Sequence, residues 1–380
     1  MIVEKLSSSI DIKKYLHNIN VDSGGVSILS SKAKTHIISI KDLNVGGANI
    51  LKQDALSIGA DLAVPRGTVL AKTPKVDCIL IATTAQLKTL SKKELAQPFG
   101  LKDLAQRLKN IVNVKMPKTV EVMGIINAND DSFVRESRFS DLGAIEKIEK
   151  MIEEGASIID IGGVSSAPNT KSVSIEEELS RVKPICDLIK KKKLYEKARF
   201  SIDSYEPKVI EYALNAGFSI VNDITGLVND EVAKVAAKHN ATVVIMHMQG
   251  KPETMQEAPS YENILDELYI FFQERIAKAE SFGISDIVLD VGIGFGKTLE
   301  NNLTLIKHLE HFMTLGKPLL VGASRKSMIN MLDASEVEDR LGGTLAIHLE
   351  SVKNGAAILR VHDVKEHSQA LRLQKALCGV

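Results

Sequence analysis

The stretch RFSIDSYEPKVIEYALNAGFSIVNDITG, residues 199–226, contains one complete strand–helix–strand unit. Residues 199–202 and 219–221 are short apolar runs, which are typical of strands buried on both faces. Between them, residues 207–216 place apolar side chains at helical spacing, and Pro207 and Gly217 stand where that helix is expected to begin and end. The stretch therefore predicts two parallel strands joined by a helix.

The same unit recurs from Thr119 onward. Strands are expected at 120–126, 157–161, 199–202, 219–221, 242–246, 286–289, 318–321 and 357–359. Helices are expected at 142–154, 175–191, 207–216, 230–239, 261–282, 302–315, 337–353 and 364–376. A glycine follows several of these helical runs, and Ser174 with Glu177 forms a capping-box pattern. Eight such repeats over roughly 260 residues predict an α/β fold of the (β/α)8 barrel type, which has about 250 residues.

A doubly wound open sheet is the alternative fold. Such sheets usually have fewer repeats and a glycine-rich turn after the first strand, whereas the first strand here is followed by NANDD at 127–131. Residues 1–116 are less regular, with apolar runs at 36–40 and 77–81 and a helical pattern at 95–108. They predict a small N-terminal α/β module, in which no cluster of catalytic or ligand-binding residues is recognised. The expected boundary is at Met116-Pro117, so the barrel spans 117–380.

The composition limits the classes of partner. The 380 residues are 44% apolar and 25% charged, the net charge is zero, and Trp is absent. A nucleic-acid partner or an anionic membrane surface would call for a basic field, so neither is expected. The three cysteines include no CxxC pair, and the first residues show no signal peptide. No apolar run is long enough for a transmembrane helix, so a cytoplasmic soluble protein is expected.

Polar residues follow the expected strands one after another. A barrel enzyme carries its active site at these carboxyl ends. Taken alone, an Asp or Asn after a strand is as often an N-cap for the next helix as a functional residue. Their recurrence at the same end of the barrel, which we call its mouth, favours an active site. The residues are Asn127, Asp160, Asp203, Asn222, Asp223, His247, Asp290, Lys297, Arg325, Lys326, Arg360 and His362.

These side chains divide by charge. A carboxylate beside an amide, as in Asp203, Asn222 and Asp290, can recognise a flat heterocycle with adjacent donors and acceptors. The basic groups after the last two expected strands suit a polyanion such as a diphosphate. Asn127 could bind Mg²⁺ through its carbonyl oxygen, shared with phosphate. The mouth is thus interpreted as a heterocycle pocket beside a phosphate pocket.

Single residues allow other interpretations. GIGFGKT at 292–298 fails the P-loop pattern because Val291 stands where Gly is required. Lys326 could serve a Schiff-base aldolase, yet a diphosphate site explains the neighbouring arginines more directly. His247 is more simply a core histidine than a metal ligand, and Lys297 could be a solvated loop charge.

At these residues the chain resembles the dihydropteroate synthase family. The blocks, in the family's order, are MGIINANDDSF (123–133), DIGGVSSAP (160–168), SIDSY (201–205), NDITG (222–226), MHMQGKPETMQ (246–256), DVGIGFGKT (290–298), GASRKS (322–327) and RVHDV (360–364). The resemblance implies an enzyme that joins 6-hydroxymethyl-7,8-dihydropterin diphosphate to 4-aminobenzoate, giving dihydropteroate and pyrophosphate. It also implies Mg²⁺, a homodimer and a target of sulfonamides.

The resemblance carries roles to individual positions. The residues matching its pterin contacts are Asp203, Asn222, Met246, Asp290, Phe295, Gly322 and Lys326. Those matching its pyrophosphate and Mg²⁺ contacts are Asn127, Arg360 and His362. Those falling where the family surrounds 4-aminobenzoate are Ser166, Pro168, Lys326 and Ser327. Among all these, Lys326, Asp203 and Asp290 are expected to take part in catalysis.

Some positions depart from the family's pattern. Val164 and Ala167 replace a Glu and an Arg of GGESTRP, Val291 replaces a Pro, and the first loop lacks its usual Thr and Pro. Two alternatives therefore stand beside the synthase. A pterin-binding methyltransferase barrel would not need the SRKS and RVHD blocks, and a non-catalytic pterin-binding protein would not need Asn127, Lys326 and Arg360.

Overall fold

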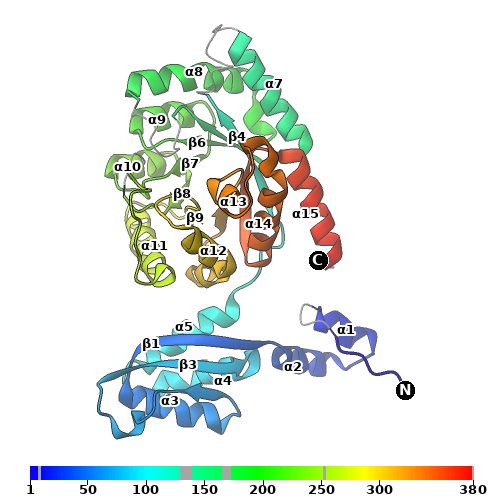
Figure 1. Cartoon of the computed structure of the whole chain (residues 1–380), viewed down its shortest axis with the longest axis vertical. Coiled ribbons are helices and arrows are strands. Elements are labelled where there is room, and N and C mark those ends of the chain that lie inside the picture. Colours follow the sequence, from blue (N-terminus) through cyan, green and yellow to red (C-terminus); the bar gives the residue numbers. More distant parts are fainter. Residues whose placement is uncertain (7–9, 129–138, 165–172, 251–253, 379–380) are drawn as a thin grey trace. The chain divides into compact units, whose positions relative to one another are not determined.

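The computed structural model describes residues 1–378 except 7–9, 129–138, 165–172 and 251–253. Contacts divide the chain into two compact units, Met1–Lys115 and Met116–Cys378. The first is coloured blue to cyan in Figure 1 and the second cyan to red. Within the described residues, no helix combines the length and apolar character needed to cross a membrane.

Parallel strands of the second unit close into a barrel, which confirms the predicted fold class. Their order around the ring is β10-β11-β4-β5-β6-β7-β8-β9, and the last strand, β11, closes the ring by pairing with the first, β4. The strands are β4 (Glu121–Asn127), β5 (Ile158–Gly162), β6 (Arg199–Asp203), β7 (Ile220–Asp223), β8 (Thr242–Met246), β9 (Ile287–Asp290), β10 (Leu319–Val321) and β11 (Ala356–Val361).

Helices surround this ring (Figure 1). They are α7 (Phe139–Glu154), α8 (Ile175–Lys192), α9 (Pro207–Asn215), α10 (Asp230–Lys238), α11 (Ile264–Ser281), α12 (Leu299–Lys307), α13 (Ser327–Leu332), α14 (Leu341–Lys353) and α15 (Val364–Cys378). The sequence did not predict the short α13. The run 302–315, predicted as one helix, is α12 followed by a 3₁₀ segment, Leu309–Leu315.

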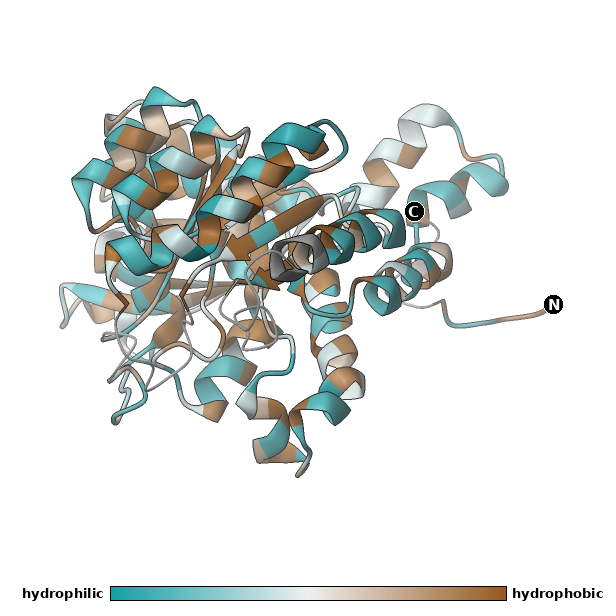
Figure 2. Cartoon of the chain, turned by 90° about the horizontal axis from the view of Figure 1, so that it is seen from above, coloured by the Kyte–Doolittle hydropathy of each residue, from teal (hydrophilic) through white to brown (hydrophobic). Residues whose placement is uncertain are grey.

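The barrel strands are buried because apolar side chains pack on both of their faces. One layer fills the inside of the barrel with Met123, Ile158, Ile220, Val244, Val288, Leu320 and Ile358. A larger cluster packs between the strands and the surrounding helices. In Figure 2 the helices carry both teal and brown residues, as expected for helices with one face on the core.

The predicted helix ends are present in the structure. Gly155, Gly217, Gly283, Gly316 and Gly355 all have positive φ, the conformation in which glycine costs least. Ser174 accepts a hydrogen bond from the Glu177 backbone N–H at 3.2 Å, which is the first half of the predicted capping box. These ends set the short loops that return the chain to the next strand.

The first unit is a three-stranded antiparallel sheet with helices on it. The strand order is β1-β3-β2, formed by β1 (Thr35–Asn44), β3 (Lys75–Thr83) and the short β2 (Asp61–Ala63). The helices are α1 (Ile12–Asn18), α2 (Ser23–Ala33), α3 (Val45–Ser57), α4 (Thr84–Lys93) and α5 (Leu101–Asn113). Alternate residues of β3 are buried, so one face of the sheet covers this unit's own core.

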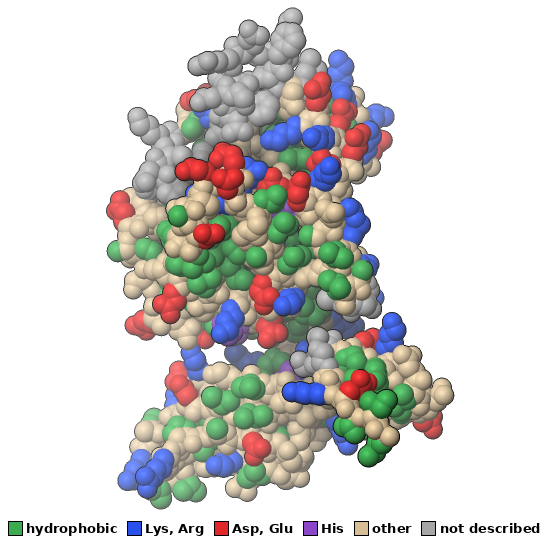
Figure 3. Space-filling view, turned by 45° about the vertical axis from the view of Figure 1, so that its right-hand side comes forward, with side chains coloured by type: hydrophobic (Ala, Val, Ile, Leu, Met, Phe, Trp, Pro, Cys, Tyr) green, Lys and Arg blue, Asp and Glu red, His purple; other side chains and the backbone are tan. Residues whose placement is uncertain are grey.

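The surface of the barrel unit carries mixed charge. Figure 3 shows basic and acidic side chains interspersed on the face that it draws. This agrees with the equal numbers of basic and acidic residues, 48 each. Cys78 and Cys186 are both buried and free, so neither forms a disulfide in the described chain.

Candidate active site

A buried network of charges lies at the carboxyl ends of the strands. The Arg360 guanidinium, on β11, donates from Nε to Asp160 Oδ2 at 2.6 Å and from Nη2 to Asp203 Oδ2 at 2.7 Å. Asn222, on β7, donates to the same Asp160 oxygen at 3.2 Å. Four strands thus meet in one network, which brings together predicted heterocycle-binding and phosphate-binding residues.

Asp160 is the member of this network that the sequence analysis left without a role. Its side chain is fully buried, and its second oxygen, Oδ1, has no hydrogen-bond partner among the residues described. A carboxylate inside the apolar run Ile158–Gly162 was the available signal. Since a buried charge needs a partner, that signal predicts a cation beside it.

Burial tunes the ionisable groups of the mouth. It raises the pKa of Asp203 to about 7, although Arg360 acts to lower it. It also raises the pKa of Asp290, on β9, which accepts a hydrogen bond from the Gly292 backbone N–H at 2.8 Å. Burial, and then the Arg360 charge, lower the pKa of Lys326 to about 8. Such shifts are typical of functional sites.

Lys326 lies over an aromatic ring at the edge of the mouth. Its Nζ is 4.1 Å from the centroid of the Phe295 ring, a cation–π distance. Phe295 belongs to a small apolar cluster with Ile224, Met246 and Met255. The mouth therefore has an apolar wall beside its carboxylates, and that combination suits a flat, polar ring.

The two arginines predicted to bind an anion have different roles. Arg325 forms an ion pair with Asp363, from Nη2 to Oδ1 at 2.5 Å and from Nε to Oδ2 at 3.1 Å, and is thereby occupied. Arg360, in contrast, lies in the mouth, where it contacts Asp160 and Asp203. His362 was counted among the cations, but burial and Arg360 lower its pKa to about 4, so it is neutral at pH 7.

Lys297 is not a solvated loop charge. Only 3% of it is exposed. Its Nζ donates to the Phe295 carbonyl at 2.9 Å and to the His247 carbonyl at 3.1 Å, and it lies 3.0 Å from His247 Nδ1. His247 is buried and pairs edge-on with Phe271, in agreement with the core interpretation. Lys297 thus ties the loop after β8 to the loop after β9.

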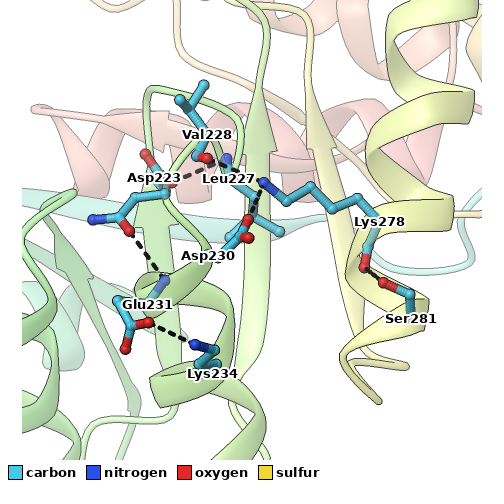
Figure 4. A network of polar contacts seen from close by, with 9 residues as sticks. Asp223, Leu227, Val228, Asp230, Glu231, Lys234, Lys278 and Ser281 are labelled. Carbon is cyan, nitrogen blue, oxygen red and sulfur yellow. Dashed lines mark hydrogen bonds and ion pairs between the residues drawn. The ribbon is translucent and has the colours of Figure 1, made fainter.

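Asp223, next to Asn222, makes its hydrogen bonds within the turn that follows β7. One of its oxygens accepts hydrogen bonds from the Thr225 N–H and hydroxyl, and the other from the Leu227 N–H. The chain beyond this turn is fixed by Lys278 on α11, which forms an ion pair with Asp230 at the start of α10 at 2.7 Å (Figure 4). Asp223 is therefore not the N-cap of the next helix, which is Asn229, but accepts hydrogen bonds from the turn after β7.

The other predicted residues lie around the same mouth. Asn127 ends β4 and is partly exposed, Gly322 follows β10 next to Arg360, and Ser327 begins α13 with its side chain exposed. Ser166 and Pro168, predicted beside 4-aminobenzoate, lie outside the described residues, as does Ala167. Val164 is described and partly buried.

Known proteins resemble this chain in sequence and in fold. Residues 123–362 match the family model "Pterin binding enzyme". The dihydropteroate synthase of Escherichia coli K12 is 42% identical over 258 residues, which cover 67% of this chain and 90% of that protein. This chain belongs to the dihydropteroate synthase family.

A solved structure and a relative that matches the whole chain extend the comparison. A crystal structure of the Yersinia pestis dihydropteroate synthase with a sulfonamide drug complex has a TM-score of 0.64 and 36% identity, and covers 70% of this chain and 96% of that one. A Helicobacter pylori protein named bifunctional dihydropteroate synthase/dihydropteroate reductase is 42% identical over 377 residues, 99% of each chain. That match includes the N-terminal unit, beyond the barrel shared with other members of the dihydropteroate synthase family.

Proposed function

We propose that this chain joins 6-hydroxymethyl-7,8-dihydropterin diphosphate to 4-aminobenzoate and releases pyrophosphate. The observation that carries the proposal is the network in which Arg360 touches Asp203 while Lys326 lies nearby. It sets groups suited to a diphosphate beside groups suited to a heterocycle. Curated relatives at 41–42% identity are named dihydropteroate synthases. The proposed reaction is therefore a transferase reaction.

The chemistry follows from the charges. The bond between the pterin's methylene carbon and the diphosphate oxygen breaks, and its electron pair leaves with pyrophosphate. The aryl amine then forms a bond to that carbon and loses a proton. In this proposal Asp203 and Asp290 stabilise positive charge on the pterin, Asn222 orients the ring, and Arg360 and Lys326 stabilise the departing anion.

A magnesium ion fits the oxygen chemistry of the mouth only if the substrate supplies most of its ligands. The described residues contain no cluster of three acidic, His or Cys side chains that could hold a metal. Asn127 offers one amide oxygen at the end of β4, and the diphosphate would supply others. When bound, Mg²⁺ would withdraw charge from the leaving group. The Asn127 side-chain oxygen would then be the ligand that the protein supplies to Mg²⁺.

The direct test is pyrophosphate release by the purified chain. With the pterin diphosphate and Mg²⁺, release should depend on 4-aminobenzoate, and dihydropteroate should form in equal amount. Lys326→Ala serves as the inactive control. Tight pterin binding without turnover would instead support a non-catalytic pterin-binding protein and would overturn the proposal.

The end-to-end match to the Helicobacter relative supports a second activity. We propose that the chain also reduces dihydropteroate, its own product. A hydride from a reduced nicotinamide would go to the carbon of the product's C=N bond, and a proton would go to the nitrogen. The observation that favours this is the 99% coverage of both chains, which includes the N-terminal unit.

Reduction is measured separately from synthesis. The full chain is given dihydropteroate and a reduced nicotinamide, and oxidation of the nicotinamide is followed by absorbance. Tetrahydropteroate should accumulate in proportion. If the chain makes dihydropteroate but never oxidises the nicotinamide, the second activity is wrong while the first stands.

A homodimer is also proposed, on the basis of the family. Exposed apolar side chains on the barrel unit include Met331 at 64% and Leu332 at 60%, both on α13. Exposed apolar side chains of this kind are available to a partner surface. Light scattering after gel filtration should give twice the chain mass of 41.4 kDa, and a monomer at micromolar concentration would contradict this.

A further inference from the structure

Two buried histidines connect the loops after β10 and β11. His348, on α14, is 0% exposed and His367, on α15, is 1% exposed. The Ala323 N–H donates to His348 Nε2 at 3.1 Å, His348 Nδ1 lies 2.8 Å from His367 Nε2, and His367 Nδ1 lies 2.6 Å from the Asp363 carbonyl oxygen. The three contacts form one continuous chain, which we name the histidine relay.

The direction of every hydrogen bond in the histidine relay is determined by its ends. A backbone N–H can only donate, so Nε2 of His348 must accept. A neutral imidazole has one N–H, so His348 Nδ1 donates to His367 Nε2. His367 Nδ1 then carries the second proton and donates to the Asp363 carbonyl, which can only accept. Both ends agree on a single pattern, in which both rings are neutral and protonated at Nδ1.

The surroundings favour the neutral forms. Burial, and then the neighbouring His367, lower the pKa of His348 to about 3, and burial lowers the pKa of His367. A proton added to His348 Nε2 would face the Ala323 N–H. A buried relay with all partners satisfied is rigid, because any broken link leaves a polar group without water.

The histidine relay connects the loops after β10 and β11 close to the proposed diphosphate-binding groups, because Lys326 lies in the first of these segments and Arg360 lies near the end of β11. Ala323 lies three residues before Lys326, and Asp363 lies three residues after Arg360. The mechanism does not use His348 or His367, and neither belongs to the motifs of the sequence analysis. Two further contacts join the same loops, the Arg325–Asp363 ion pair and the Ser324–His362 hydrogen bond at 2.9 Å.

We propose that His348 and His367 are positioning residues that fix the distance between these two loops, and so the spacing of Lys326 and Arg360 around the diphosphate. This inference rests on the proposed synthase function. Binding groups held at a fixed spacing lose little freedom when the anion arrives, and a displacement of about 1 Å can cost as much as a hundredfold in rate. Neither histidine touches the substrate.

The first test needs no variant and no turnover. In the ¹⁵N-labelled full chain at neutral pH, long-range ¹⁵N–¹H spectra distinguish the two neutral tautomers of each of the nine histidines. His348 and His367 should both be Nδ1–H tautomers, and single substitutions assign the signals. Finding either ring protonated, or as the Nε2–H tautomer, overturns the relay whether or not the chain is a synthase.

The second test separates positioning from general stability. His367→Ala should raise the KM for the pterin diphosphate, and weaken pyrophosphate binding in calorimetry, by about tenfold, the effect of one buried hydrogen bond. The KM for 4-aminobenzoate should stay within about twofold. His367→Asn, whose amide can donate to the Asp363 carbonyl, should restore part of the loss.

A matched control lies on the same helix. Ser368 is 6% exposed, and its hydroxyl has no hydrogen-bond partner within the described chain. Ser368→Ala should therefore leave both KM values unchanged. Equal effects of His367→Ala on both substrates, or no effect on pyrophosphate binding, would assign the pair a purely structural role and refute the proposal. If the wild-type chain shows no turnover, pyrophosphate binding measured by calorimetry and the histidine tautomers measured by NMR still test the proposal.

Discussion

Replacing Arg360 with Met should destabilise the barrel strongly and in a pH-dependent way. The guanidinium is the cation that contacts both Asp160, whose side chain is 0% exposed, and Asp203, whose side chain is 11% exposed, at 2.6 and 2.7 Å. At an effective dielectric constant of about 20, each contact contributes roughly 6 kcal/mol of Coulomb attraction. Desolvation of the three ions offsets most of it. Removing one partner of a buried pair leaves a net loss of about 3–5 kcal/mol.

The pH dependence follows from Asp203. Its folded pKa, about 7, lies above the ordinary 3.8, so the folded chain binds more protons than the unfolded chain between these values and loses stability as pH rises. Arg360 lowers the folded pKa of Asp203, so in its absence the pH range over which stability falls extends to higher pH. The loss in Arg360→Met should therefore be larger at pH 8 than at pH 5, where the carboxyl can be protonated.

Urea unfolding followed by circular dichroism measures both effects. Arg199→Met is the matched control, since its guanidinium contacts Glu121 at 2.7 Å with both side chains more than a third exposed. That surface pair should be worth at most about 1 kcal/mol. If Arg360→Met and Arg199→Met unfold at the same urea concentration at pH 8, or if the loss is the same at pH 5, the argument from burial is wrong.

Three further predictions concern single residues. Lys326→Ala should nearly abolish pyrophosphate release while its circular dichroism spectrum stays that of the wild type; an active variant would remove its proposed role. Asp203→Asn should weaken binding of the dihydropterin about tenfold in calorimetry, and unchanged affinity would count against the assignment. Gly292→Ala should cost about 2 kcal/mol or more in urea unfolding, because φ is +65° and the new Cβ would lie 2.0 Å from the His247 carbonyl oxygen. Gly342→Ala, with open space around it, is its control, and equal midpoints for the two would refute the steric argument.

The barrel could be predicted from the sequence because its strands are continuous apolar runs. The strand predicted at 242–246 coincides with β8, and the others differ by one or two residues at one or both ends. In the first unit, the helices α1 to α4 were not predicted. Two of the shortest elements of the chain were missed as well. β2 has three residues, of which only Leu62 is buried, so it has no periodicity to detect. α13 has six residues directly after the Lys326 loop, too few for two turns of a pattern.

The residues of the mouth could be predicted better than their pairings. Asp203, Asn222 and Asp290 were located because each ends a predicted strand. That Arg360 would turn to Asp160 depends on the order of strands around the ring, which places β11 two positions from β5. For Lys297 the alternative of a solvated loop charge was wrong, because carbonyl oxygens of two loops accept hydrogen bonds from its ammonium group.

The closure of the ring by β11 has a consequence for synthesis of the protein on the ribosome. Asp160 and its partner Arg360 are separated by 200 residues, and β4 has a free edge until β11 arrives. A nascent chain that has emerged only as far as β10 therefore holds an unneutralised carboxylate inside an incomplete sheet with two open edges. Such edges pair readily with other chains. The strand β11 thus completes the barrel, and a ribosome that stalls before it would leave a chain prone to aggregate.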